Sequence, residues 1–350
     1  MTQRNLSPYQ MFRQLAEKHK PECSFNGKTK DDFNKWKKVA LPKVLATLGD
    51  FPKRVPLNPE LLIEWEHDGL IKQRWAIDTQ EYLSVIVQVN FLPKLRKGGR
   101  HPALCCWHGH SQFGKESVMG NDSSDQRQAD IRNRNYNYGH QMAQSGFVTF
   151  GIDWIGKGEL DDAARPSYLN LAGDRDWCNL YYLNATMLGM SAIGINVTLG
   201  RAATDFVCTL PWVDADRLGV MGLSGGGTMT LWSTLCDRRF KASEIICYSS
   251  IWPRMGFRDL DYCGMQVAPG LFKLVDIPDA QGLIAPQPLL IDIGIHDTCF
   301  PVDDAMICYH KVETIYKAAG AAQKLELDLF PGEHAWGGHR SKDFFKKHLG

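Results

Sequence analysis

From about residue 61 onward, short apolar runs alternate with longer amphipathic segments. Runs such as 103–107 and 218–221 have no charged position, which is typical of strands buried on both faces of a parallel sheet. Segments 62–66, 72–77 and 83–89 alternate or run apolar between turns, and they predict antiparallel strands at a sheet edge. The same patterns predict further strands at 147–152, 243–248, 288–293 and 324–330.

Helical periodicity appears between these strands. Segments 131–145 and 193–210 are predicted helices, and apolar positions recur at helical spacing from Val302 to Tyr316. Strands that alternate with helices favour an α/β fold with a mostly parallel central sheet flanked by helices.

Three segments do not follow this alternation. Residues 1–60 are largely helical and charged in pattern, and we expect a helical extension packed on a main α/β domain that spans 61–350. Two insertions, at about 156–185 and 252–281, look irregular and contain several aromatic residues. Long insertions in a compact domain are commonly functional, so we expect them to form a cap that walls a pocket.

Composition excludes several functional classes. The 350 residues include 40 basic and 39 acidic ones, so the net charge of +1 indicates neither a nucleic-acid partner nor a membrane surface. We expect a small-molecule substrate, and a homo-oligomer stays possible. No apolar run approaches the roughly 18 residues of a membrane span, and no secretory signal is seen, so we expect a cytoplasmic protein.

The ten cysteines form no Cys-x-x-Cys pair. Several of them lie in apolar strand or helix patterns, which favours reduced, buried thiols. Their spacing indicates neither a zinc site nor a disulfide framework, and we expect no cofactor.

The chain carries a Gly-x-Ser-x-Gly motif at Gly222–Gly226. The motif follows the apolar run 218–221 and precedes a helix-compatible run, which is the strand–turn–helix context of a nucleophile elbow. We therefore predict Ser224 as a nucleophile. A serine hydroxyl needs a base to take its proton and a third group to orient that base.

In this sheet architecture the acid follows a later strand and the histidine follows the last one. Asp297 and His334 occupy those positions and are the predicted acid and base. Asp292, Asp303 and His339 are weaker alternatives, because Asp292 lies within a strand, Asp303 begins a helix and His339 comes five residues later.

A developing oxyanion needs backbone N–H donors. We assign them to Gly225, which follows the nucleophile, and to His110 in the loop after strand 103–107. A different interpretation makes His108 and His110 half of a metal site, completed by His334 or Asp153.

Aromatic and charged residues at strand ends are candidates for the substrate-binding walls. These are Trp154, Glu159, Trp252, Arg254 and Met255. For the aromatic ones, core packing is an equally open interpretation. The segment 153–159 contains Gly-x-Gly but lacks the Gly-Lys-Ser/Thr of a phosphate-binding loop.

Taken together, these motifs resemble those of the α/β-hydrolase superfamily, and within it the dienelactone-hydrolase-related and acetyl xylan esterase-like serine esterases. The resemblance extends over about 60–345 and rests on five segments, at 108–110, 153–159, 213–227, 284–297 and 331–334.

Two departures limit what the resemblance implies. Gly225 stands where the acetyl xylan esterase type usually has glutamine, and Ser224 stands where dienelactone hydrolases have cysteine. The resemblance therefore implies an esterase with a Ser-His-Asp triad acting on a small or medium-sized substrate, without naming that substrate. The alternatives are an amidase or peptidase of the same fold, a metal-dependent hydrolase, and a non-catalytic binding protein.

Overall fold

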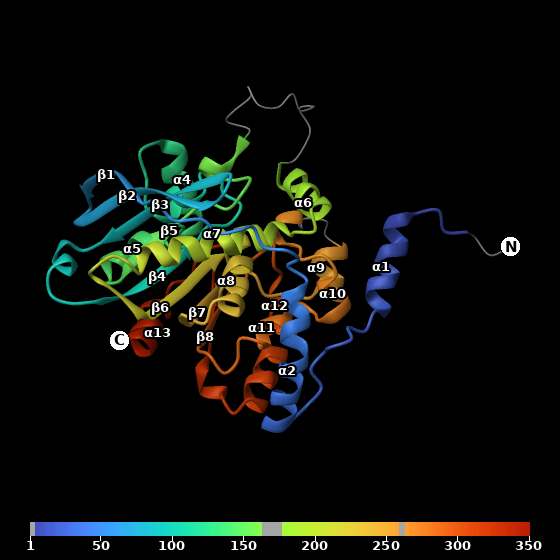
Figure 1. Cartoon of the computed structure of the whole chain (residues 1–350). Helices are drawn as coiled ribbons and strands as arrows, with labels where there is room; N and C mark the ends of the chain where they lie inside the picture. The colour runs from blue at the N-terminus through green and yellow to red at the C-terminus, as the bar shows by residue number, and fades with distance from the viewer. Residues whose placement is uncertain (1–3, 163–176, 259–262) are drawn as a thin grey trace.

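A nine-stranded sheet forms the centre of the protein, with strand order β1-β2-β3-β5-β4-β6-β7-β8-β9 (Figure 1). The computed structural model describes residues 4–162, 177–258 and 263–350. Strands β1, β2, β3 and β5 pair antiparallel, and all pairs from β5 to β9 are parallel, which confirms the predicted fold class. The strands are β1 Glu60–His67, β2 Leu70–Gln80, β3 Leu83–Phe91, β4 His101–Trp107, β5 Val148–Gly151, β6 Val213–Leu223, β7 Phe240–Ile246, β8 Leu289–Gly294 and β9 Leu325–Phe330.

Helices cover both faces of the sheet, as the alternation along its strands requires. On β4, Cys105 and Trp107 join the core beneath α2, α7, α8 and α12, whereas Leu104 and Cys106 join the core beneath α5 and α13. The helices are α1 Pro8–Lys18, α2 Lys30–Ala46, α3 Lys115–Val118, α4 Asp125–Arg134, α5 Tyr138–Gln144, α6 Trp177–Met187, α7 Ala192–Val207, α8 Gly225–Cys236, α9 Trp252–Arg258, α10 Leu271–Leu274, α11 Ile277–Gly282, α12 Val302–Ala318 and α13 Ser341–Leu349. Within the described ranges, none of them combines the length and apolar character needed to cross a membrane.

Three sequence predictions about helices were wrong in detail. The single helix expected at 131–145 is two helices, because Asn135 adopts a left-handed conformation (φ 46°) that ends α4. The insertion at 156–185 contains α6, and the insertion at 252–281 contains α9, α10 and α11. The apolar side chains of α6 are spread around the whole helix and do not form one stripe, so no helical period is visible in its sequence. Residues 163–176 and 259–262 of these insertions lie outside the described part.

The N-terminal segment packs along the second insertion. The Cys23 N–H donates to the carbonyl of Leu274 (2.7 Å), and the Phe25 N–H donates to the Asp279 carboxylate (2.9 Å). Thr29 and Asp32 form a capping box that fixes the start of α2, which then runs beside α12 (Figure 1).

Strand β1 is one edge of the sheet. Its pairing with β2 contains a register shift between Leu61 and Ile63. Leu61, Leu62 and Ile63 are all exposed, and glutamates at 60, 64 and 66 flank them.

Candidate active site

Ser224 lies in a sharp turn between β6 and α8. Its backbone has φ 61° and ψ −118°, a conformation that L residues rarely adopt and that strained functional turns contain. A Cβ on Gly222 would lie 2.5 Å from the Gly226 carbonyl oxygen, and one on Gly226 would lie 2.3 Å from that of Trp107. The glycines of the motif are therefore required by the close approach of the strand, the helix and the neighbouring loop.

Asp297 and His334 lie together at the carboxyl ends of β8 and β9. His334 Nδ1 is 2.8 Å from Asp297 Oδ2. The other carboxylate oxygen accepts the N–H groups of Cys299 (2.8 Å) and Phe300 (2.9 Å), and the Phe300 ring stacks on the imidazole at 5.7 Å. The carboxylate is thus fixed from both sides, which leaves Nε2 as the imidazole nitrogen available to a substrate or nucleophile.

Ser224 and His334 line one cavity of about 220 Å³. His110 and Met255 from the sequence prediction also line it. The predicted nucleophile, the predicted base and one predicted wall residue, from three distant segments, therefore meet at a single concave site.

The alternative acids and bases lie elsewhere. Asp292 is buried in β8 on the α13 side, where burial and the neighbouring Glu244 and Asp328 raise its pKa. His339 Nδ1 lies 3.3 Å from Asp328, and its side chain is 61% exposed. Asp303 lies in the first turn of α12, as the helix-terminus interpretation expected.

The loop after β4 is held against the nucleophile by buried side chains. The Gly109 N–H donates to the Tyr136 hydroxyl, and the Tyr138 hydroxyl donates to the Trp107 carbonyl. A Cβ on Gly109 would lie 3.1 Å from Ser224 Cβ, which shows how closely this loop approaches the turn. The Gly225 N–H is the first of α8, where a helix has no internal acceptor for it.

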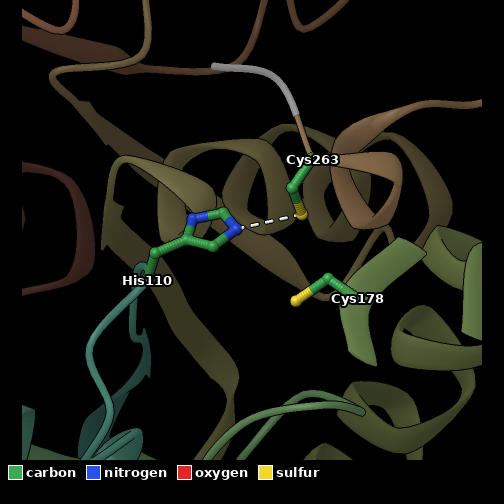
Figure 2. A group of neighbouring side chains, drawn as sticks. All are labelled: His110, Cys178 and Cys263. Carbon is green, nitrogen blue, oxygen red and sulfur yellow. Dashed lines mark hydrogen bonds between the residues drawn. The ribbon is translucent and has the colours of Figure 1, made fainter. Parts of the chain in front are cut away.

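His108 has a structural position in this loop. It is fully buried, and its Nε2 accepts the Trp154 N–H (3.2 Å) while Nδ1 donates to the Gly109 carbonyl (2.7 Å). Burial lowers the pKa of His108 to about 4, so the ring is neutral at physiological pH. His108 therefore does not join His110 as the sequence-based metal hypothesis required. The His110 ring points instead toward Cys263 (Figure 2).

Four of the five predicted wall residues lie outside the Ser224 cavity. Trp154 is fully buried beneath the His110 ring, and Glu159 pairs with Lys115 and Arg74. Arg254 pairs with Asp304.

Trp252 lines a different and larger cavity, of about 560 Å³, between α1 and α9–α10. The described residues that line this larger cavity are mostly apolar and include none of Ser224, Asp297 and His334.

Sequence reasoning missed several residues of the Ser224 cavity. Arg134 and Tyr136 reach it from the end of α4, and Gln266 reaches it from the second insertion. No motif marks these positions, because each depends on how a loop or insertion folds over the sheet. Ser111, Cys299 and Phe300 were closer to detection, since they directly follow predicted motifs.

Comparison with known proteins gives a consistent assignment. The model of the Abhydrolase family matches residues 1–327. A putative hydrolase, YtaP, of Bacillus subtilis is 24% identical over 282 residues, covering 79% of this chain and 86% of that protein.

Two solved structures are similar to this one. A putative acetyl xylan esterase from Bacteroides fragilis has a TM-score of 0.75 at 17% identity, covering 94% of this chain and 83% of the other. A glucuronoyl esterase from Solibacter usitatus has a TM-score of 0.65 at 15% identity, with coverages of 91% and 94%. At these identities the likeness establishes a shared fold.

Proposed function

Because this chain belongs to the Abhydrolase family, we propose that it is a serine hydrolase that cleaves a carboxylic ester through an acyl-enzyme. The observation that carries the proposal is one cavity shared by Ser224, in a strained elbow, and His334, whose Nδ1 is bound to Asp297. These are the three groups that activation of a serine hydroxyl requires.

In this mechanism Ser224 Oγ attacks the acyl carbon while His334 Nε2 takes the hydroxyl proton. The tetrahedral intermediate collapses, the C–O bond to the alcohol breaks, and His334 returns the proton to the leaving oxygen. Water then attacks the acyl-serine by the same route, which releases the acid and restores the Ser224 hydroxyl. Asp297 holds the imidazole in the required tautomer and stabilises its charged form.

The oxyanion is stabilised by backbone donors. We assign them to the N–H groups of Gly225 and His110, because both residues adjoin Ser224 and the Gly225 N–H has no acceptor within its own helix. The bonds that Gly109 makes, its N–H to the Tyr136 hydroxyl and its carbonyl to His108 Nδ1, fix the loop that presents His110. Such donors are effective because they need no reorganisation during the reaction.

The size of the cavity supports a small acyl group. A volume of about 220 Å³ lies below the roughly 300–1,000 Å³ common for drug-sized ligands. The structurally similar protein from Bacteroides fragilis is named a putative acetyl xylan esterase, which agrees with an acetyl-sized group.

Labelling with a fluorophosphonate probe, read by intact mass, tests the proposal. We expect one adduct on the wild type and on a Ser123→Ala control, since Ser123 is exposed and far along the chain from the elbow. Ser224→Ala should lose both the adduct and p-nitrophenyl acetate turnover, by at least about 10³-fold. An adduct that persists in folded Ser224→Ala, or turnover within a few fold of wild type, would contradict the assignment.

A further inference from the structure

Two thiols and an imidazole converge at the edge of the Ser224 cavity. His110 comes from the loop after β4, Cys178 from the first turn of α6, and Cys263 from the start of the short 3₁₀ turn Gly264–Gln266. One ligand atom from each lies within 4.8 Å of the other two, and His110 Nε2 is 3.0 Å from Cys263 Sγ. Figure 2 shows all three side chains pointing into the same space.

The geometry points to a zinc site: we propose that His110, Cys178 and Cys263 bind one Zn²⁺ ion. Two sulfur ligands and one imidazole nitrogen form a donor set that zinc favours over magnesium or calcium, which prefer oxygen ligands. In a tetrahedral site, Zn–N of about 2.0 Å and Zn–S of about 2.3 Å place the ligand atoms about 3.5–3.8 Å apart. The 3.0 Å between His110 Nε2 and Cys263 Sγ must lengthen by about half an ångström to reach that spacing, and the other two pairs, which lie within 4.8 Å, must shorten by at most about 1.3 Å.

The backbone that presents these ligands is held by contacts independent of them. The Gly264 N–H donates to the Asn179 side chain (2.9 Å), and a Cβ on Gly264 would lie 2.6 Å from Tyr182 Cβ. Close packing of the 3₁₀ turn on α6 therefore brings Cys263 to Cys178. A site whose elements are already in place requires less ordering when an ion binds.

The His110 ring is fixed in the same way. It lies edge-on against Trp154, with the ring centroids 5.0 Å apart at 71°. A Cβ on Gly225 would lie 3.2 Å from His110 Cε1, so the ring also packs on the start of α8. Its Nε2 can reach an ion shared with Cys178 and Cys263 without leaving this position.

Burial and access differ among the three ligands in a useful way. Cys178 is buried, Cys263 is half-buried and His110 is exposed, so the ligands are sheltered on one side and an ion can enter from the other. Within the described residues, no further His, Cys, Asp or Glu ligand atom joins the cluster. The three described ligands would fill three of the four positions of a tetrahedral zinc site.

An ion here would connect the two insertions to the loop that carries His110. It would thereby fix these insertions against the floor of the cavity, the part of the protein that contains Ser224. This role is separate from ester cleavage, so its tests use metal content and spectra and do not depend on turnover.

Metal content is the first test. Protein kept reduced with a phosphine is loaded with Zn²⁺, freed of excess metal and analysed by mass spectrometry of the elements. We expect one zinc per chain in the wild type and in Cys208→Ser, a control at a half-buried cysteine outside the cluster. Cys178→Ser and Cys263→Ser should each lose stoichiometric zinc. Zinc retained by both variants, or absent from the reduced wild type, would overturn the proposal.

Cobalt substitution tests the geometry in the wild type, so it does not depend on how the variants fold. Co²⁺ should give intense tetrahedral d–d bands and a thiolate-to-cobalt charge-transfer band, and Zn²⁺ should raise the melting temperature by a few degrees. A weak octahedral spectrum without charge transfer would exclude thiolate ligation. A Cys178–Cys263 disulfide found in protein alkylated at lysis would also overturn the proposal, because the two cysteines would then be a redox pair and not zinc ligands.

Discussion

The floor and the walls of the Ser224 cavity are built in different ways. The floor consists of the elbow around Ser224, the loop 108–111 and the turns that carry Asp297 and His334. Backbone hydrogen bonds, buried tyrosines and glycines in close contact hold it together. Met255 and Gln266 of the second insertion form a wall that meets this floor through side chains, and each insertion places one thiol beside His110.

This difference separates chemistry from selectivity. A cavity floor held by its own hydrogen bonds keeps the reacting groups in place before a substrate arrives. Walls made of side chains on short helices can change with little effect on that arrangement. Substitutions in the floor should therefore change turnover or stability, whereas substitutions in the walls should change which substrate is preferred.

The largest effect is expected at the acid. Asp297→Asn should lower kcat about 10³- to 10⁴-fold with the fold intact, because the amide no longer fixes the His334 tautomer. Steady-state turnover of p-nitrophenyl acetate, with circular dichroism for folding, measures this. Asp292→Asn is the matched control and should keep turnover within a few fold, since Asp292 faces the α13 side. The reverse ranking would move the acid to Asp292.

The next effect concerns pH and Glu244, a carboxyl on β7 that binds the segment following His334. Glu244 is buried and accepts hydrogen bonds from Trp336 Nε1 (3.0 Å) and Ser341 Oγ (2.6 Å). Burial raises the pKa of Glu244 to about 7 from 4.5, so the folded protein keeps a proton that the unfolded chain releases. This group's contribution to the free energy of unfolding therefore falls as pH rises from 4.5 to about 7.

Glu244→Gln tests that sign. Glutamine keeps an acceptor oxygen for both donors. As pH rises from 5 to 8, the free energy of unfolding of the variant should therefore increase relative to that of the wild type by on the order of 2 kcal/mol. Urea unfolding at both pH values measures the difference. Buried His108 has a lowered pKa, which makes the free energy of unfolding rise with pH between about 4 and 6.5. Both proteins contain His108, so its contribution cancels when the variant is compared with the wild type. A constant difference between the two proteins at all pH values would show that Glu244 is already ionised.

A smaller loss is expected at Tyr136. Tyr136→Phe removes the hydroxyl that accepts the Gly109 N–H and leaves that buried donor without its partner. We expect about 1–3 kcal/mol of lost stability and a decrease of about tenfold in kcat as the loop beside Ser224 loosens. Tyr82→Phe, at an exposed tyrosine, should match the wild type in both measurements. Equal stability of the two variants would show that this bond does not hold the loop.

The smallest effect should appear in the walls. Met255→Ala enlarges the cavity without touching Ser224 or His334, so kcat/KM for a butyrate ester should rise about 3- to 10-fold relative to acetate. Met187→Ala, at an exposed methionine, should leave this ratio unchanged. An unchanged ratio in Met255→Ala would mean that the acyl group lies on another wall.

The floor of the Ser224 cavity was more predictable from sequence than its walls, for a physical reason. Ser224 and the flanking glycines form one continuous motif. Asp297 follows a largely apolar strand, and His334 follows a strand that alternates apolar and acidic residues. Each of these positions is set by local chain geometry and by the order of parallel strands.

The wall residues depend on tertiary packing. Cys178 and Cys263 approach each other only because the 3₁₀ turn at Gly264 packs on α6, and α6 shows no helical stripe in its sequence. Trp154 looked like a wall residue because it follows a strand, yet it lies buried beneath His110. Spacing along the chain carries no information about such contacts.

The exposed edge strand β1 has a consequence for the protein at high concentration. Three adjacent apolar side chains, Leu61, Leu62 and Ile63, next to unpaired backbone groups would invite edge-to-edge association with another molecule. The irregular register between Leu61 and Ile63 distorts that edge, and the glutamates at 60, 64 and 66 would be brought together by an antiparallel copy. The same short strand thus contains both the hazard of aggregation and the features that protect solubility.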